Sequence, residues 1–130
     1  MIDSVRTYHA SCHCGAVRFR FRSEEITQGL RCNCSICVRK GIVMSPRYYR
    51  PEEIEQLEGE SFLTLYQFAD KDVSHYFCRT CGIYPFNRVA KVPPSYKGPA
   101  RPGDCRVNLG CVQEVDVFAL DIQVIDGRSF

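Results

Sequence analysis

Clustered cysteines constrain this chain of 130 residues more than any other feature of its sequence. Of the nine cysteines, all but Cys105 and Cys111 fall into short clusters. The clusters are Cys12-x-Cys14, Cys32-x-Cys34-x-x-Cys37 and Cys78-x-x-Cys81-Gly82. Two sulfurs bound to one tetrahedral zinc at about 2.3 Å lie about 3.8 Å apart, a distance that cysteines at i and i+2 of a strand can match. A C-x-x-C-G turn reaches it through a glycine with positive φ, so the clusters predict metal sites.

The sizes of the clusters suggest how the cysteines divide between sites. A closed structural zinc site takes four protein ligands, whereas a catalytic site usually takes three and leaves one position free. Clusters of two, three and two cysteines divide naturally into four plus three, so we predict two zinc ions per chain. The closed site uses Cys12, Cys14, Cys78 and Cys81, and the open, candidate catalytic site uses Cys32, Cys34 and Cys37.

Two alternatives remain open at this level. Cys78 and Cys81 could form a reactive dithiol, although no βαβ pattern surrounds them and a second pair of cysteines is available. The second site could be closed, with a fourth ligand from Cys105, Cys111 or one of the histidines, which we otherwise interpret as structural.

Composition limits the class of protein. The length suits one globular domain over residues 1–130, and a net charge of +2 argues against a nucleic-acid binder. The first eleven residues lack an apolar leader region, and no apolar run is long enough to cross a bilayer. We therefore predict a cytoplasmic protein that does not span a membrane, and a reducing compartment favours metal binding over disulfides.

Hydrophobic periodicity predicts a mostly β protein with one or two short helical turns. Residues 16–22 alternate apolar and polar side chains with the period of a half-buried strand, and residues 62–68 repeat that period. Shorter β-type runs occur at residues 42–44, 75–77, 106–109 and 121–125. Helical turns are expected at residues 35–40 and 51–57, and the Pro- and Gly-rich residues 92–104 predict a surface loop.

The open cluster lies in a basic stretch, residues 31–50, that contains no acidic residue. Zinc bound to three thiolates is a poor generator of hydroxide, but it readily binds and deprotonates an incoming thiol. The basic stretch could hold the carboxylates of a small anionic thiol such as glutathione. The candidate anion-binding residues are Arg39, Lys40, Arg47 and Arg50, with Tyr48 or Tyr49 available for hydrogen bonding.

These motifs match a known family. The sequence resembles the glutathione-dependent formaldehyde-activating enzymes and the related centromere protein V domain over most of its length. The matching segments are residues 11–17 (SCHCGAV), 32–37 (CNCSIC), 77–82 (FCRTCG) and 107–110 (VNLG), in the order of the family. The resemblance implies a β-tent fold in which zinc joins two small antiparallel sheets, with the same two sets of cysteine ligands.

The resemblance also implies an activity. The family's named enzyme forms S-hydroxymethylglutathione from formaldehyde and glutathione, which makes it a carbon–sulfur lyase in the reverse direction. Members that share the cysteines differ in activity, so the metal sites alone do not define the reaction. The alternatives are a zinc-stabilised binding module without turnover and a redox sensor whose thiolate zinc site is oxidised.

Overall fold

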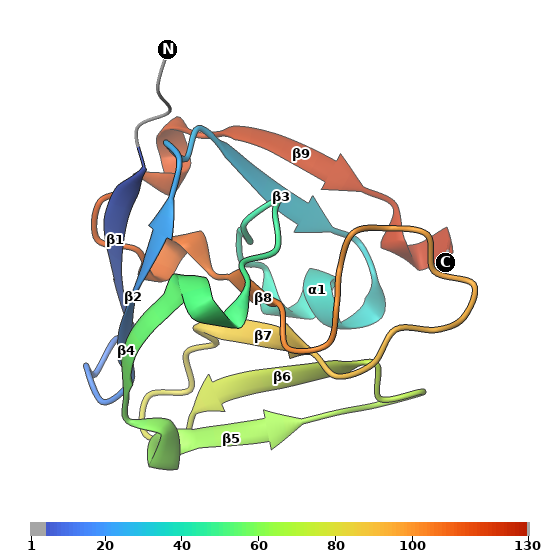
Figure 1. The fold of residues 1–130 in the computed structure, drawn as a ribbon, viewed down its shortest axis with the longest axis horizontal. Helices are drawn as coiled ribbons and strands as arrows, with labels where there is room; N and C mark the ends of the chain where they lie inside the picture. Colours follow the sequence, from blue (N-terminus) through green and yellow to red (C-terminus); the bar gives the residue numbers. More distant parts are fainter. Residues whose placement is uncertain (1–4, 130) are drawn as a thin grey trace.

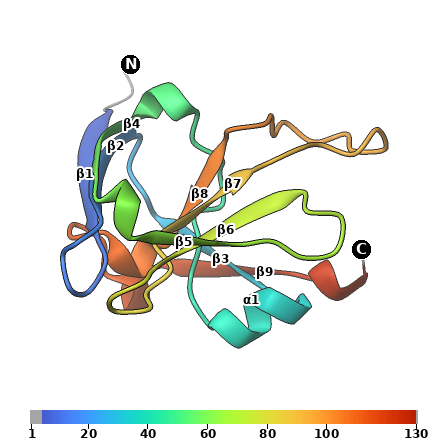
Figure 2. The same cartoon turned by 90° about the horizontal axis from the view of Figure 1, so that it is seen from below.

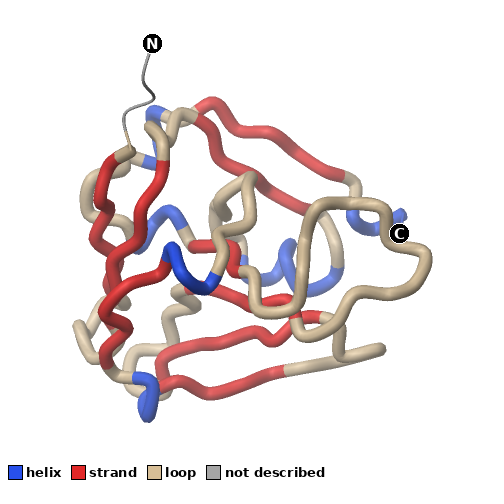
Figure 3. Tube along the Cα trace, in the orientation of Figure 1, coloured by secondary structure: helices blue, strands red, loops and turns tan. Residues whose placement is uncertain are grey.

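Strands account for most of the regular structure in the computed structural model, which describes residues 5–129 (Figure 3). The strands are β1 (Arg6–Ser11), β2 (Arg18–Ser23), β3 (Gln28–Cys32), β4 (Ile54–Glu58), β5 (Leu63–Tyr66), β6 (Val73–Cys78), β7 (Phe86–Val89), β8 (Cys105–Val107) and β9 (Asp121–Ile125). Helix α1 (Ser35–Lys40) is accompanied by 3₁₀ turns at Pro51–Glu53, Glu60–Phe62, Leu109–Cys111, Val117–Ala119 and Gly127–Ser129. The mostly β fold is confirmed, as is the helix expected at residues 35–40.

The strands form the two antiparallel sheets that were predicted and one parallel pair that was not (Figure 1). One antiparallel sheet has the order β1-β2-β4, and the other has the order β5-β6-β7-β8. The parallel pair joins β3 to β9, close to the end of the described chain. Isolated bridges from Leu30 to Met44 and from Met44 to Asn108 connect β3 to the segment that follows β8.

The alternating pattern of β2 builds one side of the core. Phe19 and Phe21 are 4% and 0% exposed, whereas the arginines between and beside them face outward or are only partly covered. Phe21 contacts Tyr49 with ring centroids 4.9 Å apart, and Phe19 contacts Phe86 of the four-stranded sheet at 5.4 Å. Each such side chain contributes about 1.5–3 kcal/mol on burial, so these contacts hold the two antiparallel sheets against each other.

The helix expected over residues 51–57 is wrong beyond its first turn. A 3₁₀ turn covers Pro51–Glu53, after which the chain extends as β4 and pairs with β2. Ile54 lies opposite Phe21 in this pairing, and its side chain packs against the core. Proline suits the first position of a short 3₁₀ turn as well as that of a helix, and strand pairing then outweighs the weak helical preference of the residues that follow.

Three segments extend toward the same side of the molecule in both views (Figures 1 and 2). They are the β5–β6 connection, the β7–β8 connection and the turn Gly127–Ser129 after β9. The expected surface loop at residues 92–104 lies in the second of these and contains no helix or strand. Among residues 5–129, none of the helices has the length and apolar character needed to cross a bilayer.

Candidate metal centres and the adjoining cavity

The first cysteine cluster joins the turn after β1 to the turn after β6. The Sγ atoms of Cys12 and Cys14 are 3.7 Å apart, and so are those of Cys14 and Cys78. Together with Cys81, all four sulfur atoms lie within 4.8 Å of one another. This spacing agrees with the distance of about 3.8 Å between sulfurs of one tetrahedral zinc. The fold thus brings together the four cysteines expected for the closed site, and they could hold a metal ion.

The backbone around the first cluster favours thiolates. Gly82 has φ +77°, and its N–H donates to the carbonyl of Cys78 at 2.7 Å, which closes the C-x-x-C-G turn. Burial raises the pKa of Cys81, but hydrogen bonds from the backbone at Cys14 and Ile83 outweigh it, so this pKa falls to about 6. Metal binding requires deprotonated cysteines, and the turn supplies the amides that stabilise them.

The second cluster lies where β3 gives way to α1. Cys32 ends β3, Cys34 caps the helix and Cys37 lies within it, with the three sulfur atoms within 4.8 Å of one another. The N–H of Cys34 donates to Cys32 Sγ at 3.4 Å. Burial and the neighbouring sulfurs raise the pKa of Cys37 to about 12, against the attraction of the Lys40 ammonium. Three thiols this close resist joint ionisation until a cation neutralises them, so this donor set also suits a metal ion.

Within residues 5–129, no other cysteine, histidine or carboxylate joins the second cluster. Cys105 is 2% exposed in the core, where its thiol faces the carbonyl of Gly103 at 3.6 Å. Cys111 lies near Cys12 and Cys81 of the first cluster instead, and burial together with these neighbours raises its pKa to about 12. The alternative in which Cys105 or Cys111 closes the second site disagrees with these positions. A tetrahedral ion held by the second cluster would keep one position for an outside ligand.

The turn after β9 packs directly against the second cluster. Asn33 donates from Nδ2 to Asp126 Oδ1 at 2.9 Å and accepts from the N–H of Arg128 at 2.9 Å. Gly127 approaches so closely that a Cβ atom added to it would overlap Cys32 Sγ. Glycine is therefore required at this position for a steric reason.

Gly127→Ala is expected to displace Cys32 Sγ and to weaken metal binding at the second cluster by about 10–100-fold, the effect typical of lost support around a ligand. A competition titration with a chromophoric chelator would measure the affinities of both sites. Ser129→Ala in the same turn is the control, because it removes a hydroxyl without adding bulk near sulfur. Unchanged affinity at the second cluster in Gly127→Ala would contradict the steric argument.

A cavity of about 310 Å³ opens beside the second cluster. Cys34, Cys37 and Lys40 line it from α1, and Tyr48, Phe68, Asp72, His75, Asn87 and Arg106 line it from the other segments. A neighbouring hollow of about 680 Å³ extends along the β7–β8 connection and shares Tyr48 and Arg106 with the first. The two spaces therefore adjoin at these shared side chains.

Two cations of the cavity have no carboxylate partner within the described chain, Lys40 and Arg106. Lys40 Nζ lies 4.0 Å from the centre of the Tyr84 ring. The Arg106 guanidinium lies 4.1 Å from the centre of the Tyr48 ring, and Nη2 donates to the Pro46 carbonyl at 3.2 Å. Its Nε is buried without a hydrogen-bond partner. Both cations are thus available to an anionic ligand.

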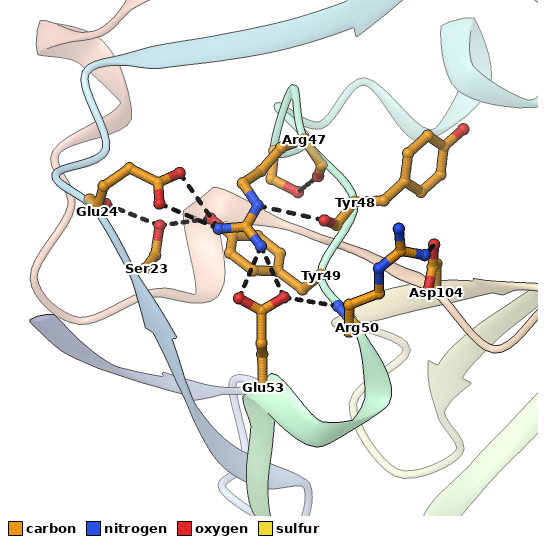
Figure 4. Close-up of polar contacts among 9 residues, drawn as sticks. Ser23, Glu24, Arg47, Tyr48, Tyr49, Arg50, Glu53 and Asp104 are labelled. Atoms are coloured by element: carbon orange, nitrogen blue, oxygen red, sulfur yellow. Dashed lines mark hydrogen bonds and ion pairs between the residues drawn. The ribbon is translucent and has the colours of Figure 1, made fainter. Parts of the chain in front are cut away.

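Two of the predicted anion-binding residues are neutralised by carboxylates (Figure 4). Arg47 donates to both oxygens of Glu53 at 2.6 and 2.8 Å and to both oxygens of Glu24 at 3.2 Å. Arg50 donates to Asp104 Oδ2 at 2.6 Å. Both arginines border the larger hollow. Their charges, however, are used in ion pairs that join separate segments of the fold.

Asp104→Asn is expected to lower the free energy of unfolding by about 2–3 kcal/mol. The Asp104 side chain is 2% exposed, and the change leaves Arg50 without its counter-charge. The effect should remain below the 3–5 kcal/mol of a fully buried pair, because the Arg50 side chain is 30% exposed. Urea denaturation would measure it, with Glu58→Gln as the control in the exposed Arg18–Glu58 pair, where less than about 0.5 kcal/mol is expected.

Of the other residues predicted to contact the anionic thiol, two line the cavity and two do not. Lys40 and Tyr48 line the cavity, whereas Arg39 is exposed and donates to the carbonyl of Ser35 at 2.8 Å. Tyr49 is 1% exposed in the core, with its hydroxyl 2.9 Å from that of Ser23.

Sequence reasoning missed five polar residues of the cavity wall, namely Asp70, Asp72, His75, Asn87 and Arg106. The last three come from different strands of the four-stranded sheet, where β6, β7 and β8 lie side by side. Only the order of these strands brings them together, and no local motif marks them. His75, which we interpreted as structural, is placed on the cavity wall.

Comparisons with known proteins agree with this geometry. The chain matches the family model described as glutathione-dependent formaldehyde-activating enzyme over residues 7–123. It is also similar to the crystal structure of a Rhodobacter sphaeroides protein, with 30% sequence identity and a TM-score of 0.66. That match covers 88% of this chain and 99% of the other. With its two cysteine clusters brought together as the motifs predict, this chain belongs to the family of glutathione-dependent formaldehyde-activating enzymes.

Proposed function

We propose that this chain is a zinc-dependent enzyme of the carbon–sulfur lyase type that joins a small anionic thiol to an aldehyde. Glutathione and formaldehyde, which give S-hydroxymethylglutathione, are the pair favoured by the family description. We further propose Zn²⁺ at both clusters, structural at the first and catalytic at the second. The predicted cytoplasmic location agrees with chemistry that depends on reduced thiols.

One observation carries this proposal. The three-cysteine cluster borders a cavity that also contains two cations without carboxylate partners in the described chain. When bound by three thiolates, zinc supplies a position that accepts a thiol as its thiolate. A ligand with a thiol at one end and carboxylates at the other could occupy both features together.

The cavity residues suggest how such a ligand is oriented. We assign its carboxylates to Lys40 and Arg106, because both line the cavity. Asp70 and Asp72 line the same cavity and provide carboxylates for an ammonium group. Glutathione carries two carboxylates and one ammonium, so its charges are complementary to this lining. The guanidinium charge of Arg106 has no carboxylate partner within the described chain, so it remains for a charge-assisted hydrogen bond to the ligand.

The reaction then needs few groups. The thiolate sulfur adds to the aldehyde carbon, an S–C bond forms, and the π pair of the C=O bond moves to oxygen. The oxygen takes a proton from water, and the hydroxide that remains combines with the proton that the thiol released on binding. The side chains hold the thiol in place for this step, with Phe68 forming an apolar part of the wall.

The first experiment is zinc content per chain together with X-ray absorption at the zinc edge, before and after addition of glutathione. We expect two zinc ions, with average sulfur coordination that rises when glutathione binds. Exchange NMR of glutathione and formaldehyde should then show interconversion of thiol and adduct faster than in buffer.

Different outcomes would point elsewhere. Two zinc ions with four protein ligands each, unchanged by glutathione, would contradict the open site and favour a binding module without turnover. A second zinc ion released by stoichiometric peroxide, with no acceleration of adduct exchange, would favour a redox sensor.

A further inference from the structure

His75 has an unusual position for a core histidine. It lies in β6 and is 6% exposed, yet it lines the same cavity as Cys34 and Cys37. Its Nδ1 is 2.6 Å from the hydroxyl of Tyr84, and the ring of Phe68 stacks on it at a centroid distance of 5.6 Å. Nε2 has no hydrogen-bond partner among the contacts of residues 5–129 and is not fully enclosed. A nearly buried imidazole therefore keeps one ring nitrogen free in the cavity that Cys34 and Cys37 also line.

The contact between the Tyr84 hydroxyl and Nδ1 favours one tautomer of His75. The backbone N–H of Arg106 donates to Asn87 Oδ1 at 3.2 Å, so the amide nitrogen of Asn87 is left as the donor on its other side. The Asn87 side chain also acts to lower the pKa of the Tyr84 hydroxyl, against the larger effect of burial. Burial raises the pKa of Tyr84, so the hydroxyl keeps its own proton and donates it to His75 Nδ1. The imidazole then carries its proton on Nε2.

The electrostatic environment keeps this imidazole neutral. Burial, and to a smaller extent the charge of Lys40, lower the pKa of His75 to about 4. At neutral pH the ring is thus a hydrogen-bond donor at Nε2 without a net charge. Such a donor stabilises negative charge that develops on oxygen. Because the ring has no net charge, it does not compete with the second cluster for the thiolate.

We propose that His75 is a catalytic residue whose Nε2–H donates a hydrogen bond to the aldehyde oxygen while the thiolate sulfur adds to the carbon. The inference rests on the proposed function and names the group that receives the developing charge. The S–C bond forms and the C=O π pair becomes a lone pair on oxygen. Water then protonates the oxygen, and His75 keeps its proton throughout. Tyr84 acts as a positioning residue through its contact with His75 Nδ1.

A matched pair of variants separates catalysis from structure. Asparagine at position 75 can place a polar atom near Nδ1 and keep the contact with Tyr84, but it cannot reach the position of Nε2. Glutamine can place an amide N–H near Nε2. His75→Asn should therefore lose about 10²–10³-fold in kcat, as expected for one donor to an oxyanion, while His75→Gln should recover at least tenfold of that loss. The affinity for glutathione should change less than threefold in both variants.

Histidine ¹⁵N NMR tests the arrangement without using activity. The chain has three histidines, and the resonances of His75 are assigned by their loss in His75→Gln. We expect the Nε2–H tautomer in the wild type at pH 7, and a mixture of tautomers in Tyr84→Phe. Tyr96→Phe, on the β7–β8 connection, is the control and should leave the tautomer unchanged.

The outcomes are distinguishable. An active wild type in which the asparagine and glutamine variants are equally impaired would overturn the inference and leave the proposed function intact. An Nδ1–H or charged imidazole at pH 7 would overturn it too. A wild-type protein that fails to accelerate adduct exchange would overturn both proposals, whereas recovery by glutamine together with an Nε2–H tautomer would support both.

Discussion

Cys78→Ser is expected to leave the chain without a stable fold and without metal at the first cluster. Cys78 is 0% exposed, and its sulfur lies 3.7 Å from that of Cys14. Structural zinc sites provide about 10–16 kcal/mol of apparent binding free energy, whereas a whole domain is stable by only about 5–15 kcal/mol. Loss of one ligand therefore removes much of the stability. Circular dichroism and zinc content per chain would measure the loss.

The control for this prediction is Cys105→Ser. Cys105 is also buried, at 2% exposure, but it belongs to neither cluster. We expect this variant to keep the full metal content and to lose only about 1–2 kcal/mol of stability, the cost of a hydroxyl in an apolar site. A folded Cys78→Ser protein with unchanged zinc content would show that the first cluster does not hold a structural ion.

Cys34→Ser is expected to abolish the proposed reaction while the fold survives. Cys34 is partly exposed at the start of α1, and the cavity reaches its side chain. Without this thiolate the second ion is lost, and the rate of adduct exchange should fall by at least about 10³-fold, equivalent to about 4 kcal/mol of transition-state stabilisation. Exchange NMR with glutathione and formaldehyde would measure the rate, and circular dichroism would confirm the fold.

Cys111→Ser serves as the control here, because Cys111 lies near the first cluster and outside the cavity. It should retain activity within about twofold of the wild type. Full activity in Cys34→Ser with one zinc ion per chain would contradict the assignment of the reaction to the second cluster.

The sequence predicts well which cysteines come together, because those cysteines lie in local motifs. Cys12 and Cys14, like Cys78 and Cys81, are close in the chain, so spacing alone indicates that each pair can share an ion. The assignment of these two pairs to one site follows from ligand number, and the fold brings all four sulfurs within 4.8 Å. The helix at residues 35–40 is confirmed for a similar reason, since it begins within the cysteine motif and Gly41 ends it with φ +65°.

The substrate side of the site could not be predicted in the same way. Arg47 and Arg50 look like free cations in a basic stretch, but their carboxylate partners Glu24, Glu53 and Asp104 come from distant parts of the sequence. Net charge in a window says nothing about such pairing. The cavity residues of β6, β7 and β8 are likewise adjacent only after the strands have paired, and β4 replaced a helix because a partner strand was available.

The parallel pairing of β3 with β9 bears on how the protein forms during synthesis. Asn33 and Asp126, which connect the second cluster to the turn after β9, are 93 positions apart. Contacts of such high sequence separation form slowly, because a long loop must close before they stabilise the chain. On the ribosome, all cysteines of the first cluster have been made once Cys81 is added, whereas the wall behind Cys32 needs Asp126 and Arg128. We therefore expect the nascent chain to bind the proposed structural ion first and the proposed catalytic ion only after β9 and the turn that follows it have emerged.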